Sequence, residues 1–145
     1  MRSSGFTLIE LLVVVAIIGI LSAIGTLSYS GYVSGAKKKS TENIMQQIAL
    51  AQTEEYSMAG EYWVNGSTCT ASDTSSGQVE SALFDGTDII PSELGFNICI
   101  FGTSSNFTVK ADDGSGCVLT LPRNGTVDKS ACLLYTSDAA DDLRG

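Results

Sequence analysis

The feature that most constrains this chain is a long apolar run close to the N-terminus, with one carboxylate at its start. No residue from Leu11 to Ala36 is charged, and Glu10 immediately precedes this run. About 20 apolar residues suffice to cross the hydrocarbon core of a bilayer. A carboxylate in that environment costs roughly 2.5–3.5 kcal/mol, so Glu10 is expected to have a partner or a specific function.

The helical pattern continues beyond the apolar run. Gly60 follows the last periodic residue and is a typical helix stop, so we expect one helix from Phe6 to about Ala59, roughly 80 Å long. Its first half is apolar on all sides, and its second half is amphipathic and can pack under a small head. The apolar stripe of the second half comprises Ile44, Met45, Ile48, Ala49, Ala51 and Tyr56, with Glu42, Gln46, Gln47 and Glu54 elsewhere on the circumference.

The remainder of the chain predicts a loop followed by strands. Residues 61–90 are rich in Ser, Thr, Gly and Asp, with Tyr62-Trp63-Val64 as a hydrophobic anchor. Strand-like runs follow at 96–101, 107–111 and 117–121, separated by turn clusters, and Asn124-Gly125 suits a tight turn into a last strand at 126–129. The predicted fold class is α+β: a long N-terminal helix packed against a small antiparallel β-sheet of three or four strands.

The four cysteines, Cys69, Cys99, Cys117 and Cys132, all lie after residue 60. None forms a C-x-x-C pair and the chain has no histidine, which argues against a zinc site. An even number of cysteines in an exported, loop-rich domain favours disulfides. Three pairings are possible, and proximity in sequence favours Cys69–Cys99 with Cys117–Cys132. Reduced, buried thiols are the alternative.

Charge and residue types exclude several function classes. The net charge of −8 argues against a broad nucleic-acid surface, and the absence of histidine excludes Ser-His and Cys-His nucleophile pairs. We therefore predict no catalytic residue, no cofactor and no metal. The loop at 112–116 could hold Ca²⁺ through Asp112 and Asp113, but a solvated turn is the preferred interpretation. The basic cluster Lys37-Lys38-Lys39 lies just past the apolar run, where it would meet anionic lipid headgroups on the cytoplasmic side or neighbouring acidic groups outside.

The aromatic side chains allow two interpretations. They could form a conducting path or a platform on which DNA bases stack, but their placement along one long helix favours packing. The residues concerned are Tyr29, Tyr32, Tyr56, Tyr62 and Trp63.

The segment Gly5-Phe6-Thr7-Leu8-Ile9-Glu10 and the apolar residues after it resemble the class III signal of the type IV pilin superfamily. The resemblance implies that a prepilin peptidase cuts after Gly5 and N-methylates Phe6, and that the retained helix becomes the core of a fibre. Cleavage would create an α-amino group at Phe6, and we expect Glu10 to act in assembly by pairing with this group in another subunit; a role in peptidase recognition alone is the alternative. An ordinary secretory signal could be cut near Ala23-Ile24-Gly25, and an uncleaved anchor would explain the length but leave Glu10 without a function.

The expected organisation is a leader at 1–5, a hydrophobic transmembrane and assembly helix at 6–30, and a head at 31–132. Residues 132–142 resemble a translated sequencing-library adapter, so residues 133–145 are interpreted as non-native, with a disordered acidic tail as the alternative. Cys132 could be encoded by the same adapter. Many pilins have a proline where this chain has Leu27.

The expected function is that of a type IV pilus subunit, held in the inner membrane and then polymerised into a surface fibre. Its partners would be further copies of itself, prepilin peptidase, the pilus assembly machinery and the inner membrane. The alternatives are a type II secretion pseudopilin and a minor pilin acting as a receptor for DNA uptake or adhesion.

Overall fold

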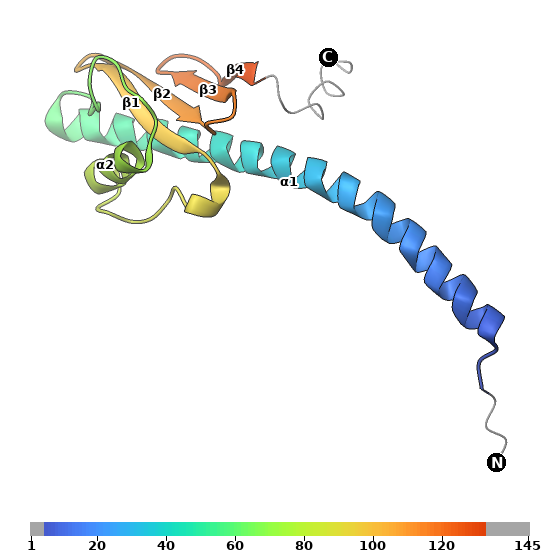
Figure 1. Ribbon diagram of the computed structural model, residues 1–145. Helices are drawn as coiled ribbons and strands as arrows, with labels where there is room; N and C mark the ends of the chain where they lie inside the picture. The colour runs from blue at the N-terminus through green and yellow to red at the C-terminus, as the bar shows by residue number, and fades with distance from the viewer. Residues whose placement is uncertain (1–4, 133–145) are drawn as a thin grey trace.

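A long helix carries a small head on its C-terminal half in the computed structural model, which describes residues 5–132. The helix α1 (Leu8–Ala59) has 52 residues, and its N-terminal half projects away from the head (Figure 1). The head packs along the other half of α1, so the two halves of one helix have different surroundings. The expected tail at 133–145 lies outside the described residues.

Both ends of α1 are set by local backbone chemistry. The helix begins at Leu8 rather than at the predicted Phe6, because Thr7 has extended backbone angles and caps the first turn with its side chain. At the other end Gly60 has φ 80°, and its N–H donates to the carbonyl of Tyr56 at 2.9 Å. A left-handed glycine is a common way to end a helix, and the predicted stop at Gly60 is correct.

Four strands form an antiparallel meander in the order β1-β2-β3-β4. They are β1 (Asn97–Thr103), β2 (Asn106–Asp112), β3 (Cys117–Pro122) and β4 (Asp128–Cys132). The first three lie within a residue or two of the predicted runs. The last is Asp128–Cys132 instead of the predicted 126–129, because its pairing with β3 runs from Asp128 opposite Thr120 to Cys132 opposite Cys117.

The core lies between the second half of α1 and one face of the sheet. Met45 and Ile48 of α1 are fully buried there. In β2 and β3 buried residues alternate with more exposed ones, as expected for strands with one covered face. Burying each large aliphatic side chain contributes about 1.5–3 kcal/mol. The sheet residues of this core include Ile98, Ile100, Phe107, Val109, Ala111, Leu119 and Leu121.

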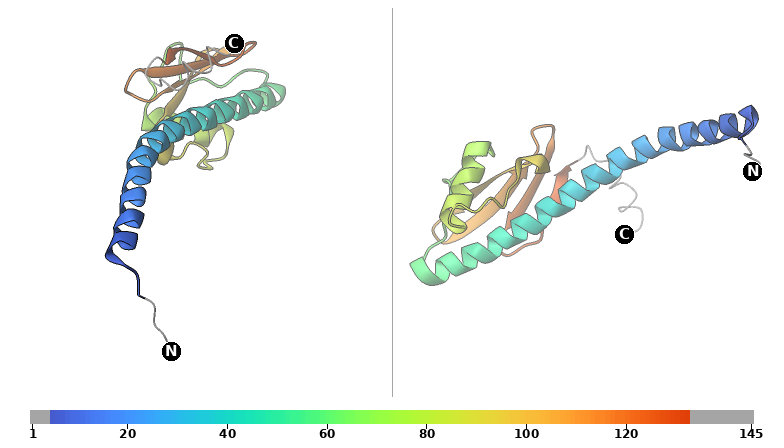
Figure 2. Two further views of the ribbon diagram at one scale, coloured as in Figure 1. Left: turned by 90° about the vertical axis from the view of Figure 1, so that its right-hand side faces the viewer. Right: turned by 90° about the horizontal axis from the view of Figure 1, so that it is seen from below.

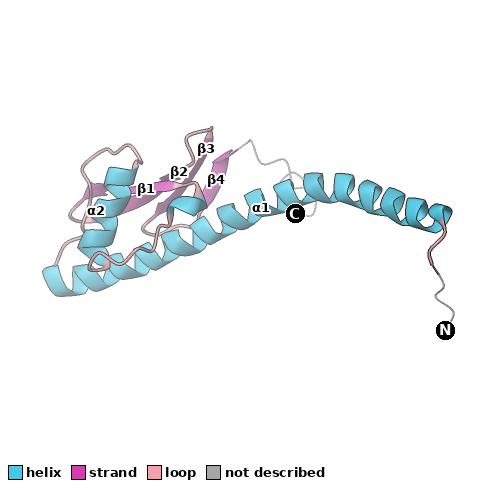
Figure 3. Cartoon of the chain, turned by 60° about the horizontal axis from the view of Figure 1, so that its bottom comes forward, coloured by secondary structure: helices cyan, strands magenta, loops and turns pink. Residues whose placement is uncertain are grey.

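The segment predicted to be a loop contains a helix, so that prediction was incomplete. The helix α2 (Asp73–Leu83) lies beside β1, and a short 3₁₀ helix, η1 (Ser92–Leu94), follows it (Figures 2 and 3). A capping box between Ser72 and Ser75 begins α2, and Val79 buries itself in the core. Its Ser, Thr and Gly content gives weak intrinsic helix propensity, so packing against β1 stabilises it.

The outer edge of β1 is closed by side chains and by the preceding loop. The backbone N–H of Ile98 donates to the Ser76 hydroxyl at 2.9 Å, and the Ser75 hydroxyl donates to the Ile98 carbonyl at 2.8 Å. The N–H of Ile100 donates to Asn65 Oδ1 at 2.7 Å, and the Asn65 N–H donates to the Ile100 carbonyl at 2.8 Å. These bonds satisfy the groups through which an open edge would pair with another strand.

Candidate functional site

The first turn of α1 holds Glu10 in a defined position. The Thr7 N–H donates to Glu10 Oε2 at 2.9 Å, and the Glu10 N–H donates to the Thr7 hydroxyl at 3.3 Å. These reciprocal bonds form a capping box. The Thr-x-x-Glu spacing was visible in the sequence, but sequence reasoning considered Glu10 only as a charge and missed its capping role.

None of the ion pairs among residues 5–132 involves Glu10. Its carboxylate lies at the positive end of the helix dipole, which favours a negative charge there. One oxygen accepts the Thr7 N–H, and a carboxylate has further lone pairs that can accept hydrogen bonds. The site can therefore receive a cation from another molecule without losing its own cap.

Gly5 and Phe6 lie immediately before the helix, outside regular secondary structure. Phe6 is 88% exposed, and no atom lies within 4 Å of the position that a Cβ on Gly5 would occupy. The predicted processing site is thus open to an enzyme. A cut between these two residues would leave the Thr7–Glu10 capping box intact.

The apolar half of α1 has no cover within the subunit. Its large side chains from Leu8 to Leu27 are 48–85% exposed, and the helix is long and apolar enough to cross a membrane by length and composition. The 20 residues from Leu8 to Leu27 span about 30 Å, the thickness of a bilayer's hydrocarbon core. This surface requires lipid or other apolar helices around it.

Two disulfides hold the head, in the pairing that sequence proximity favoured. Cys69–Cys99 ties the segment before α2 to β1, and Cys117–Cys132 links directly opposed residues of β3 and β4. The loops they close are 30 and 15 residues long. Disulfides that close loops of this length stabilise a domain by a few kcal/mol, which the chain-entropy account attributes to restriction of the unfolded chain.

The chain is similar to known proteins both in its N-terminal segment and over most of its length. A family model described as the prokaryotic N-terminal methylation motif matches residues 1–26. The type IV major pilin protein PilE of Neisseria gonorrhoeae is 35% identical over 82 residues, 57% of this chain and 45% of that protein. A fimbrial protein of Pseudomonas aeruginosa is 33% identical over 127 residues, 82% of this chain and 78% of that protein.

The chain belongs to the type IV pilin superfamily. The match spans less than half the length of the first Neisseria relatives and most of the length of the Pseudomonas relative. No solved structure matches the chain.

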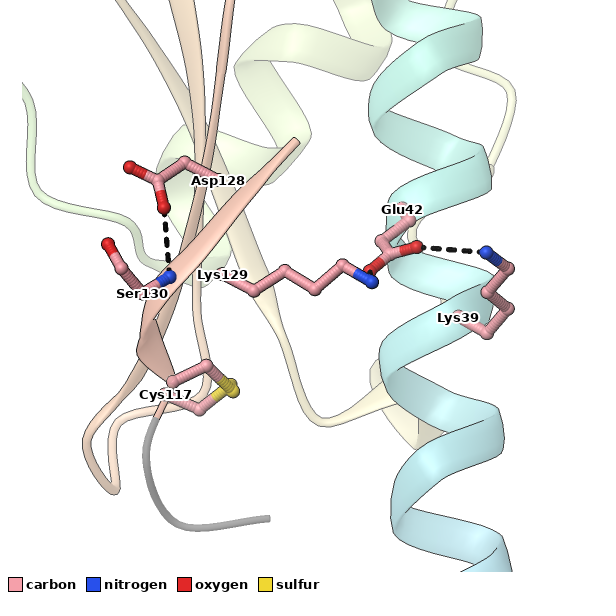
Figure 4. Close-up of polar contacts among 7 residues, drawn as sticks. Lys39, Glu42, Cys117, Asp128, Lys129 and Ser130 are labelled. Atoms are coloured by element: carbon pink, nitrogen blue, oxygen red, sulfur yellow. Dashed lines mark hydrogen bonds and ion pairs between the residues drawn. A yellow bond between two sulfur atoms is a disulfide. The ribbon is translucent and has the colours of Figure 1, made fainter. Parts of the chain in front are cut away.

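An ion pair with a buried carboxylate and a half-exposed lysine joins the last strand of this pilin to α1. Glu42, which the helical pattern placed outside the apolar stripe, has a side chain only 6% exposed. Its carboxylate contacts Lys129 Nζ at 3.0 Å and Lys39 Nζ at 3.3 Å (Figure 4). The expectation that Glu42 lies on the outer face of the helix is therefore wrong. Glu42 is buried because it pairs with Lys129, which lies 87 positions later in the chain and reaches Glu42 only after folding.

Gln52 is a second buried polar residue of α1 that sequence reasoning missed. Its side-chain amide donates to the carbonyl of Trp63, and its Oε1 accepts the Trp63 N–H at 3.0 Å. Both backbone groups of Trp63 are thereby satisfied by one fully buried side chain. This clamp fixes the chain where it leaves α1 and turns toward the sheet.

The acidic loop between β2 and β3 uses its carboxylates within the turn. Asp112 Oδ1 accepts the Gly114 N–H at 2.8 Å, and Asp113 Oδ1 accepts the N–H groups of Ser115 at 2.8 Å and Cys117 at 3.0 Å. Within residues 5–132 no three His, Cys, Asp or Glu side chains gather as a metal site would require. The loop is a side-chain-stabilised turn.

The aromatic residues divide into two groups. Tyr56 stacks on Tyr62 with ring centroids 4.6 Å apart, and Tyr62 meets Phe107 edge-on at 4.9 Å. Tyr29 and Tyr32 are 69% and 74% exposed on α1, so they do not pack within one subunit, and their packing stays a prediction. Their surface remains available to neighbouring molecules.

Proposed function

We propose that this pilin is the structural subunit of a type IV pilus. It is inserted in the inner membrane as a prepilin, cleaved between Gly5 and Phe6, methylated on the new N-terminus and polymerised into a fibre on the cell surface. The observation that carries this proposal is the uncovered apolar half of α1, about 30 Å long. Lipid covers this surface before assembly, and the helices of other subunits cover it afterwards.

Processing is supported by the form of the N-terminus. Gly5 is small and exposed, Phe6 follows in non-helical backbone, and the helix begins only at Leu8. An enzyme can therefore bind the peptide bond without unwinding α1. The mature protein should begin at Phe6 and carry one added methyl group, which intact-mass analysis measures. A mature species that retains residues 1–5 contradicts this step.

Cleavage gives Glu10 a possible partner. The new α-amino group of Phe6 is a cation at nearly the same depth as the Glu10 carboxylate. In an assembling bundle, Glu10 of an incoming subunit pairs with the Phe6 amine of a docked one. In a water-poor core such a pair is strong, and either charge left alone is costly. The pair therefore sets the axial register, while the apolar faces provide adhesion.

Replacing Glu10 tests this role against a role in peptidase recognition alone. In Glu10→Gln we expect cleavage after Gly5 to proceed and fibre formation to fail or slow severely. Thr7→Val is the matched control, because it removes the capping hydroxyl and leaves the charge, and it should still assemble. Normal fibres from cleaved Glu10→Gln protein would rule out the register role.

The relatives favour a pilus subunit over the alternatives within the superfamily. They are named as fimbrial proteins and as a type IV major pilin. A secretion pseudopilin shares the N-terminus, and a minor pilin could act as a receptor for DNA or a surface. Deletion of the gene should remove the surface fibre; intact fibres with lost secretion or lost DNA uptake would instead favour those alternatives.

A further inference from the structure

One side of the head, here called the basic flank, combines a groove with lysine side chains. The groove has a volume of about 650 Å³ and lies where α1 leaves the head. Its lining includes Gly31 and Gly35 of α1, together with Lys38, Lys39 and Lys129. Lys39 is 72% exposed and Lys129 is 47% exposed. Lys39 and Lys129 share the one buried carboxylate of Glu42, which leaves this flank positively charged, although the chain as a whole has a net charge of −8.

The C-terminal end of α1 and the segment after it carry the opposite charge, on a surface here called the acidic flank. Glu55 and Glu61 line a hollow of about 290 Å³ together with Tyr62, Trp63 and Ser104. Glu61 is exposed and Glu55 is half-buried, and neither forms an ion pair with another described residue. The Tyr62 ring already faces the guanidinium of Arg123, which lies 5.8 Å from the ring centroid, so the two carboxylates are the groups that this flank offers to a further cation.

The helical geometry places these two flanks on opposite sides of α1. Lys39 and Glu55 are 16 residues apart, which corresponds to about 24 Å along the axis and about 160° around it. Parallel subunits that lie side by side touch through opposite faces. A copy shifted by about 24 Å along the axis therefore brings its Glu55 to the level of its neighbour's Lys39.

We propose that the acidic flank of one subunit docks on the basic flank of a second copy of this chain in the fibre. This inference rests on the proposed function. The register pair of Glu10 with a Phe6 amine implies an offset of only about four residues, or 6 Å. The contact between the flanks thus joins a different pair of subunits. It connects their heads, whereas the Glu10 contact connects the N-terminal halves of their α1 helices.

Charge complementarity favours a second copy of this chain as the molecule that occupies the groove. The full chain has a net charge of −8, and removal of the leader with Arg2 makes it no less acidic, so packed subunits repel one another unless oppositely charged patches meet at their contacts. The basic flank and the acidic flank provide such patches on the same chain. The groove also continues the uncovered surface of α1 through Leu27 and Gly31, so an adjacent subunit covers both without a break.

A charge exchange tests the contact in cells that assemble the parent chain. Lys39→Glu and Glu55→Lys should each reduce sheared surface fibre, measured against total subunit, by at least about tenfold, and the double variant should restore most of it. Lys39→Gln, which leaves Lys129 on Glu42, should give an intermediate loss. Lys110→Glu and Glu93→Lys make the same charge changes away from both flanks and should assemble normally.

Several results would overturn the proposal. If the single variants assemble as well as the controls, the contact between the flanks is refuted and the proposed function still stands. If the parent chain and the controls form no fibres, the contact and the proposed function are both refuted. A Lys39→Glu defect that Glu55→Lys does not repair would point to lipid headgroups as the partner. If removing residues 133–145 makes assembly indifferent to Lys39, the chain's own tail occupies the groove. Unfolding midpoints of the solubilised variants show whether each head remains folded.

Discussion

Replacing Glu42 with glutamine is expected to lower the free energy of unfolding of the head by about 1.5 kcal/mol. Glutamine keeps the size of the side chain and can still accept hydrogen bonds, so the change removes mainly the charge. The buried carboxylate ties Lys129 of β4 to α1, and it also pairs with Lys39 three residues earlier in the same helix. In β4 only Cys132 is buried, so this strand depends on few contacts.

The magnitude follows from the exposure of the partners. A hydrogen bond to a charged group contributes about 1.5–3 kcal/mol when both partners are desolvated. Lys129 is 47% exposed and Lys39 is 72% exposed, so both contacts are weakened by solvent. We assign about 1 kcal/mol to the contact with Lys129 and a few tenths to that with Lys39. Because both lysines can turn to water, the larger cost of a stranded buried charge does not apply.

Urea unfolding of the oxidised, full-length protein in detergent measures the effect. Lys129→Gln should cost more than Lys39→Gln, and a double-mutant cycle between Glu42 and Lys129 should give a coupling of about 1 kcal/mol. Glu54→Gln is the control, because Glu54 is exposed and forms no ion pair with the described residues. A Glu42→Gln protein as stable as Glu54→Gln, or a larger effect from Lys39 than from Lys129, would refute the reasoning.

Three further predictions concern other parts of the head. Gln52→Leu should destabilise it by about 1–3 kcal/mol, because both backbone groups of Trp63 lose their partners; the fluorescence of this single tryptophan follows the change, and unaltered stability would contradict it. Gly102→Ala should prevent the β1–β2 hairpin from closing, since Gly102 has φ 147° and a Cβ would collide with the backbone of the facing strand; a folded variant with both disulfides would contradict this. Asp128 accepts the Ser130 N–H, which lowers the pKa of its carboxyl. Its contribution to stability is therefore present above the ordinary carboxyl pKa and is lost as pH falls through the lowered value. Carbon NMR of Asp128 should show the low titration, and Ser130→Ala, which keeps the backbone donor, should retain most of it.

Local sequence patterns determined the main elements of this pilin. The apolar run, the amphipathic stripe and Gly60 predicted one long helix and its end, because helix periodicity and a left-handed cap are properties of neighbouring residues. The three strands after residue 96 followed from alternation and from turn residues in the same way. The N-terminal motif, including Gly5, Phe6 and Glu10, is contiguous, so it too was readable from the sequence.

The tertiary structure decided what depends on residues far apart in the chain. The helix α2 has weak propensity and forms because Ser75 and Ser76 bond to the edge of β1, more than 20 positions later. Glu42 is buried because β4 brings a lysine to it, and Gln52 is buried because the chain turns back after Gly60. No local pattern encodes these partners, since a polar side chain on a helix is satisfied equally well by water until folding removes the water and supplies the partner.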